Sequence, residues 1–267
     1  MPFAVVGHVE VVEFLEVDRV PAPGEIVHAT SRLTVAAGGG AVAAVALARW
    51  SGGCHFYCAL GDDELGHHAE AELRARGVTV HAAWRRSPQR RAVTMIDAQR
   101  ERTITVIGER IVAHAGDALP WDELASCDGV YITGGDVGAI QHARRAKIVV
   151  ATARILRDLQ AAGIALDALV SSANDAEERY TAGQLTPEPR IVIRTDGSKG
   201  GTFVEAGATH RYTAAAAKVT GDTYGAGDTF AAGVAYALGR GAPAFEAMAD
   251  ASRLAAEVLA WHGPYPP

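Results

Sequence analysis

The chain has 267 residues, of which 49% are hydrophobic and 21% are charged, and its formal net charge is −6. This composition suffices for a large core, and the acidic balance gives no electrostatic case for a nucleic-acid partner. No apolar run approaches the roughly 18–20 residues of a membrane span and the N-terminus lacks a signal-peptide layout, so we expect no membrane association and a cytoplasmic location.

The N-terminal half contains β-branched segments and two helical patterns. Asp63 is placed to cap the second helix, and Gly77 to end it. The last two extended segments flank residues 99–101 and predict a hairpin. In chain order the predicted elements are strand structure within 3–17, a helix at 41–50, a strand at 55–60, a helix at 64–76 and extended segments at 78–84, 92–98 and 102–108.

From residue 128 onward, strands and helices alternate more regularly. Short apolar strands at this spacing, each followed by a helical pattern, are typical of parallel sheets. The predicted elements are strands at 129–133, 147–151, 168–172 and 190–195, helices at 136–146 and 153–162, a hairpin at 201–206 and 209–214, and helices at 227–238 and 243–261.

This order predicts an α/β fold with a mainly parallel sheet covered by helices on both faces. We expect one domain over 1–267. The extra extended pieces, within about 9–35 and 92–107, would form a small separate sheet that acts as a lid. Arginine clusters at 85–86 and 89–91 are interpreted as solvated surface.

The stretch GDTYGAGDTF, residues 221–230, is the most informative in the chain. Apolar residues from Phe230 onward follow helical spacing, so a helix begins near Gly227. Small residues before it leave backbone N–H groups bare at the positive end of the helix dipole, which favours an anion site. Asp228 stands where a carboxylate could take a proton from a nucleophile attacking a bound phosphoryl group. An ordinary capped helix is the alternative.

Two further stretches carry polar residues or glycines directly after predicted strands. TDGSKGG, residues 195–201, is a glycine-rich loop, which a plain hairpin turn would also explain. In NDAE, residues 174–177, Asn174 and Glu177 are three apart and would project to one side of a helical turn. They could hold Mg²⁺ with its waters, or they could form an N-terminal capping box.

The order and spacing of these stretches resemble the ribokinase-like (PfkB) carbohydrate kinase family. The D-T-x-G-A-G-D signature of that family is intact at 222–228. The N-x-x-E motif matches Asn174 and Glu177, and the T-x-G-x-x-G loop matches Thr195, Gly197 and Gly200. Near the N-terminus, the segments at 21–25, 38–40, 44–49 and 59–66 also resemble the family. The likeness covers nearly the whole chain and implies a ribokinase-like three-layer sandwich.

The resemblance implies ATP-dependent phosphorylation of a hydroxyl on a small sugar or nucleoside. Asp228 would be the general base, and the amides of Gly225, Ala226 and Gly227 would form the anion hole. Other roles carried over by position are Mg²⁺ and phosphate binding by Asn174 and Glu177, nucleotide binding by Thr195, Gly197 and Gly200, a monovalent cation near Asp222 and Thr223, and acceptor contacts by Gly38 and Gly39. A homodimer through the lid is a further expectation.

The predicted acceptor side departs from the family pattern. Val12 and Val42 stand where many members carry a polar sugar contact, and the D-P-N-type stretch reads ATAR at 151–154. We therefore expect an acceptor with an apolar face toward these valines, and free ribose as a poor substrate. Glu10 and Asp136 are candidate acceptor contacts, with plain surface carboxylates as the alternative.

Two other classes of protein are alternatives. One is a catalytically silent homologue that binds a nucleotide or sugar as a sensor, against which the intact Asp228 argues. The other is a nicotinamide-dependent oxidoreductase, which needs G-x-G-x-x-G after the first strand, where this chain has only Gly7.

Overall fold

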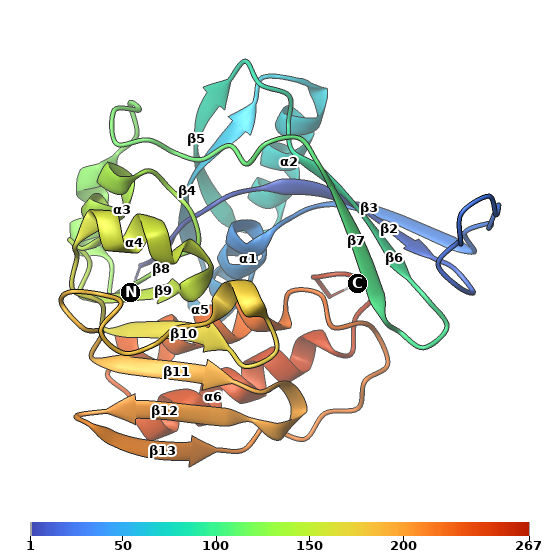
Figure 1. Ribbon diagram of the computed structural model, residues 1–267. Coiled ribbons are helices and arrows are strands. Elements are labelled where there is room, and N and C mark those ends of the chain that lie inside the picture. The colour runs from blue at the N-terminus through green and yellow to red at the C-terminus, as the bar shows by residue number, and fades with distance from the viewer. Residues whose placement is uncertain (1, 267) are drawn as a thin grey trace.

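The larger of two sheets forms the body of the molecule in the computed structural model, which describes residues 2–266 (Figure 1). Its first seven strands run parallel to their neighbours, and its last two form an antiparallel hairpin at one edge. The order across the sheet is β5 (Val78–Arg85), β4 (Cys54–Gly61), β1 (Phe3–Val6), β8 (Gly129–Ile132), β9 (Ile148–Thr152), β10 (Ala168–Ser172), β11 (Ile191–Thr195), β12 (Gly201–Glu205) and β13 (Ala208–Tyr212).

The smaller sheet, called the lid from here on, projects to one side of the body (Figure 1). Its four strands lie in the order β3 (Ser31–Ala37), β2 (Glu10–Glu16), β6 (Arg91–Ile96) and β7 (Arg102–Ile107). The β6–β7 pair is the predicted hairpin, and β2 runs parallel to β6. The prediction of a separate small sheet is therefore confirmed.

Helices cover both faces of the large sheet. Alternate residues of β1 show the two faces, because Phe3 and Val5 join one buried cluster and Ala4 and Val6 join the other. The first cluster includes residues of α1 (Gly39–Ser51), α2 (Glu64–Ala75), α5 (Ala226–Gly239) and α6 (Ala244–Val258). The second includes residues of η1 (Trp121–Ser126), α3 (Val137–Ala143) and α4 (Leu156–Ala162). The predicted three-layer α/β architecture is confirmed.

Three short 3₁₀ segments lie at the carboxyl ends of parallel strands: η2 (Ala153–Ile155), η3 (Ala176–Glu178) and η4 (Gly197–Lys199). The helix predicted at 153–162 is thus divided into η2 and α4. Within residues 2–266, no helix combines the length and apolar character needed to cross a bilayer.

Candidate active site

A cavity of about 680 Å³ opens where the parallel strands end. In an open α/β sheet this edge is the usual place for a ligand, because loops and helix N-termini converge there. The body contributes residues at or just after the ends of β1, β8, β9, β10 and β11, and the lid contributes residues of β2 and β7. Examples from these elements are His8, Thr133, Arg154, Ser172, Thr195 and Arg102.

Asp228 lies in this cavity, in the first turn of α5. The helix starts at Ala226, one residue before the predicted start, and Gly225 before it has a φ of 78°, a left-handed value that favours glycine. The Tyr131 hydroxyl donates a hydrogen bond to Asp228 Oδ1 at 3.3 Å. A Cβ added to Gly39 would lie 2.5 Å from the same oxygen. Glycine at position 39 therefore lets the start of α1 approach this carboxylate.

The carboxyl group of Asp228 holds its proton more strongly than an ordinary aspartate does. Burial and the negative charge of Glu178 raise its pKa to about 6, although Arg154 and the Tyr131 hydroxyl oppose the change. A base with a pKa near neutrality is ionised at pH 7 and can still accept a proton from a reacting group. The electrostatics thus suit Asp228 for proton transfer.

The three amides of the predicted anion hole are not equivalent. Gly225 and Gly227 line the cavity, and a Cβ added to Gly227 would meet nothing within 4 Å. Ala226 is not among the lining residues, and its N–H donates to the carbonyl of Thr223 at 3.4 Å. An anion in the cavity could therefore reach the N–H groups of Gly225 and Gly227 at the start of α5, and not that of Ala226.

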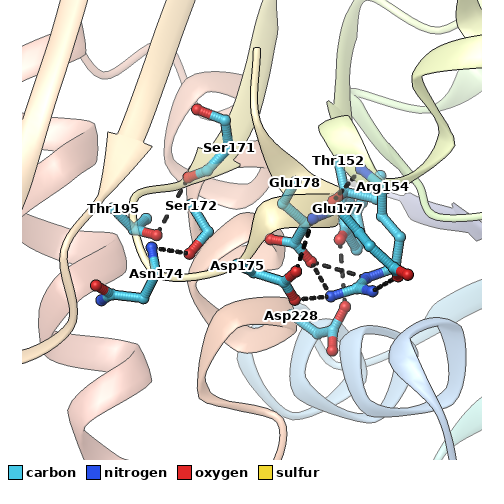
Figure 2. A network of polar contacts seen from close by, with 11 residues as sticks. Thr152, Arg154, Ser171, Ser172, Asn174, Asp175, Glu177, Glu178, Thr195 and Asp228 are labelled. Atoms are coloured by element: carbon cyan, nitrogen blue, oxygen red, sulfur yellow. Dashed lines mark hydrogen bonds and ion pairs between the residues drawn. The ribbon is translucent and has the colours of Figure 1, made fainter.

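Arg154 joins a group of carboxylates beside Asp228 (Figure 2). Its guanidinium donates to Glu178 Oε1 at 2.8 Å and to Glu177 Oε2 at 3.1 Å, and it also binds Asp175. From the sequence, residues 151–154 stand out only as a departure from the family pattern, so a role for Arg154 was not predicted. The signal was the arginine itself, placed directly after a buried strand.

Asn174 and Glu177 do not project together as the helical spacing suggested. Figure 2 shows Asn174 beside Thr195 and Glu177 beside Arg154. The capping box is also absent, because Asp175 caps η3 and accepts from the Glu177 N–H at 2.9 Å. The reason is the backbone, which makes a short 3₁₀ turn here in place of an α-helical one.

The donor set of this region fits a divalent cation. Asp175, Glu177 and Glu178 share Arg154 as an ion-pair partner, so together with Asp228 they leave a surplus of negative charge. Carboxylate oxygens are the protein ligands that Mg²⁺ prefers, and it keeps several waters when it binds to few of them.

The glycine-rich loop after β11 serves the fold as well as the cavity. Thr195 lines the cavity and its hydroxyl donates to the carbonyl of Ser171 at 3.2 Å. Gly197 and Gly200 are not among the lining residues. A Cβ at Gly200 would lie 2.2 Å from the carbonyl oxygen of Tyr212, so glycine is needed there for close packing against β13. The loop is also the predicted hairpin turn, because β11 pairs with β12 across it.

Asp222 is buried, and both of its carboxylate oxygens bind backbone amides. They accept from the N–H of Tyr224 at 2.8 Å and from the N–H of Gly263 at 2.7 Å. Thr223 is held by Arg102, which donates to its carbonyl at 2.7 Å and to its hydroxyl at 3.0 Å. The structure therefore gives Asp222 a role in anchoring the loop before α5.

Three predicted acceptor contacts lie in the cavity, and two do not. Glu10, Gly38 and Gly39 line it. Val42 is 1% exposed and faces Gly225, where a Cβ would lie 2.8 Å from its Cγ1. Asp136 caps α3, because it accepts from the Ala139 N–H at 2.7 Å and from the Ala115 N–H at 3.0 Å.

Val12 and Val42 do not form the apolar face toward the acceptor that was expected, because both are buried. Val12 is 0% exposed, so neither it nor Val42 presents a surface to the cavity.

The interpretation of both arginine clusters as solvated surface is only partly right, because Arg85 and Arg90 are partly buried and paired with carboxylates. Arg90 lines the cavity with its Nε 2.8 Å from Glu10 Oε1, and Arg85 binds Asp117 with an N–O distance of 2.6 Å. Of these clusters, Arg86 and Arg91 are exposed.

Comparison with known proteins identifies the family. The chain matches the family described as pfkB family carbohydrate kinase over residues 3–169 and 164–267, so it belongs to that family. Among curated proteins, a ribokinase from Arabidopsis thaliana is 29% identical over 135 residues. That match spans 49% of this chain and only 34% of the relative's length.

Solved structures of similar fold cover nearly the whole chain. A ribokinase from Thermotoga maritima superposes with a TM-score of 0.80 at 21% identity, covering 99% of this chain and 95% of its own. Arabidopsis thaliana ribokinase complexed with ribose and ATP gives 0.73 at 21% identity, with 98% and 93% covered. A nucleoside kinase from Methanocaldococcus jannaschii gives 0.74 at 15% identity, with 98% and 93% covered. At these identities the likeness establishes the fold.

Proposed function

We propose that this protein transfers the terminal phosphoryl group of ATP to a hydroxyl of a small sugar, sugar derivative or nucleoside. The observation that carries the proposal is Asp228, held in the cavity at the start of α5 with a pKa of about 6. The family membership and the similar ribokinase complexed with ribose and ATP support the choice of substrates.

In the proposed reaction, the Asp228 carboxylate takes the proton of the acceptor hydroxyl as its oxygen attacks the terminal phosphorus. The new bond joins that oxygen to phosphorus, the bond from phosphorus to the bridging oxygen breaks, and ADP leaves with the electron pair. The N–H groups of Gly225 and Gly227 would bind the transferred oxygens. Positioning and charge stabilisation supply most of the catalysis in phosphoryl transfer.

Mg²⁺ would be held by carboxylates of Asp175, Glu177 and Glu178, with Asn174 at the edge of the group, and would neutralise phosphate charge. Thr195 would contact the nucleotide from the end of β11. The lid borders the cavity with Ile104 and Val106 of β7, which are exposed in this structure. Their apolar side chains would help to exclude water from the reacting phosphoryl group once substrates are bound.

The test is release of ADP across a panel of sugars and nucleosides, with and without Mg²⁺. We expect release that needs both an acceptor and Mg²⁺ and that falls roughly 10²- to 10⁴-fold in Asp228→Asn, the usual contribution of a general base. A catalytically silent sensor would bind ATP or a sugar and release no ADP with any acceptor. That result would overturn the proposal.

A further inference from the structure

Four arginine side chains line the cavity: Arg90, Arg102, Arg110 and Arg154. They come from different parts of the chain, since Arg90 precedes β6, Arg102 begins β7, Arg110 follows β7 and Arg154 follows β9. Burying a guanidinium is costly without a partner, and this cost applies to Arg90 and Arg154, whose side chains are 15% and 32% exposed. Arg102 and Arg110 face water as well as the cavity. The partners of the four arginines therefore indicate what the cavity is built to receive.

The four arginines differ in their partners. Arg154 is paired with carboxylates beside Asp228, and Arg90 is paired with Glu10. Arg102 binds the oxygens of Thr223. Among residues 2–266, neither Arg102 nor Arg110 has a carboxylate within 4.0 Å of its guanidinium. Arg110 is exposed and lines the cavity without an ion pair in the described part of the chain, although the charges of Glu10 and Asp228 act on it from farther away.

The backbone of Arg90 is hydrogen-bonded to its neighbours. Its carbonyl accepts from the Val11 N–H at 3.0 Å and from Gln89 Nε2 at 3.3 Å, which fixes the backbone against β2. Its side chain is 15% exposed. Although its Nε lies 2.8 Å from Glu10 Oε1, it has no well-directed hydrogen bond in the described structure. Buried His8 Nδ1 likewise lacks a hydrogen-bond partner there.

This end of the cavity is positively charged. Burial and the charges of Arg110 and Arg90 lower the pKa of His8 to about 3, so His8 is neutral at physiological pH. Glu10 is then the carboxylate paired with Arg90, and its charge acts on Arg110 more strongly than that of Asp228 does. The opposite holds beside Asp228, where several carboxylates surround Arg154. The cavity therefore has an acidic end suited to a metal and a basic end suited to an anion.

We propose that the acceptor carries an anionic group, a phosphate or a carboxylate, which Arg90 and Arg110 bind while Asp228 faces the reacting hydroxyl. This inference rests on the proposed function, and it names the class of acceptor. The planar guanidinium matches the oxygens of either group with paired hydrogen bonds. A neutral sugar would offer Arg90 and Arg110 no charge to bind, so it would lack the charge-assisted hydrogen bonds that an anionic acceptor makes there. The anionic group takes no part in bond making and is recovered unchanged in the product.

The experiment compares neutral with anionic acceptors on the full-length protein. Ribose and fructose are set against ribose 5-phosphate, fructose 6-phosphate and gluconate, and kcat/KM is measured by ADP release. Binding of the same compounds without nucleotide is measured by calorimetry. We expect the preferred acceptor to be a phosphate or a carboxylate, and the panel distinguishes these two. For that compound, Arg110→Gln should raise KM and Kd roughly 10- to 150-fold, the usual range for a lost charge-assisted hydrogen bond.

The matched control is Arg91→Gln, because Arg91 is exposed on β6 and does not line the cavity. It should leave both constants unchanged. Ribose or fructose as the best acceptor would overturn the anion site, as would an Arg110→Gln effect equal for neutral and anionic compounds. Either result would leave the kinase function standing. Conversely, Arg110-dependent binding of an anionic sugar with no ADP release would overturn the kinase function and keep the anion site.

Discussion

Replacing Asp228 by Asn is expected to stabilise the ligand-free protein at high pH while it removes activity. In the folded protein, burial and Glu178 raise the pKa of Asp228 from 3.8 to about 6. A carboxyl group with a raised pKa stabilises the folded state below pH 3.8, where it is protonated in both states. That contribution is lost as the pH rises through about 6. Asn is uncharged and of the same shape, so it escapes the loss.

The expected change in the free energy of unfolding follows from the pKa values of Asp228 in the unfolded and folded states. At about 1.4 kcal/mol for each unit of pKa, the interval between 3.8 and about 6 corresponds to about 3 kcal/mol at pH 8. The carboxyl group is half-buried, so water screens part of this cost. We therefore expect Asp228→Asn to raise the free energy of unfolding by about 1–3 kcal/mol at pH 8. The gain should shrink toward zero near pH 4.

Urea unfolding of both proteins without nucleotide, at several pH values from 4 to 8, measures this difference. Asp222→Asn is the matched control, because Asp222 accepts two backbone N–H bonds and an amide can replace only one of them. It should lower the free energy of unfolding by about 1–3 kcal/mol. A variant at 228 that is less stable than the wild type at pH 8, or a difference independent of pH, would refute the electrostatic reasoning.

Three other variants test neighbouring parts of the site. In the wild type, kcat/KM should rise with pH through about 6 as Asp228 ionises. Tyr131→Phe should move that rise to higher pH, because the hydrogen-bond donor to the Asp228 carboxylate is lost; an unmoved profile would contradict this. Glu177→Gln should raise the Mg²⁺ concentration needed for half-maximal rate. The melting temperature should change little, since the Glu177 side chain is exposed and does not cap a helix. An unchanged Mg²⁺ requirement would remove Glu177 from the metal site. Asp136→Ala should lower stability by about 1 kcal/mol through the lost helix cap and leave KM for the acceptor unchanged; an increased KM would return Asp136 to the acceptor site.

Most strands and helices, and the start of α5 to within one residue, could be predicted from the sequence; the bounds of β3 and the division of the helix at 153–162 could not. The predicted features depend on local patterns: β-branched runs for the strands, and apolar spacing after Gly227 for the helix. The position of Asp228 followed from the same patterns, because a residue in the first turn of a helix after small residues must lie beside bare N–H groups. The family signature at 222–228 added its proposed role.

Which side chains face the cavity depends on the folded arrangement of the chain. Val42 lies on α1 where the helix packs against Gly225, and Asp136 turns back to cap α3, so both leave the acceptor side. Arg90 and Arg154 stand 64 positions apart in the chain, yet they line the same cavity.

The physical reason is that local patterns give each segment's conformation but not its neighbours. Pairing β6 beside β2 brings Arg90 to Glu10, and the order β9-β8-β1 brings the end of β9 to the same edge as the end of β1. Burial and charge in the cavity depend on those long-range contacts. The basic and acidic ends of the site therefore exist only in the folded chain.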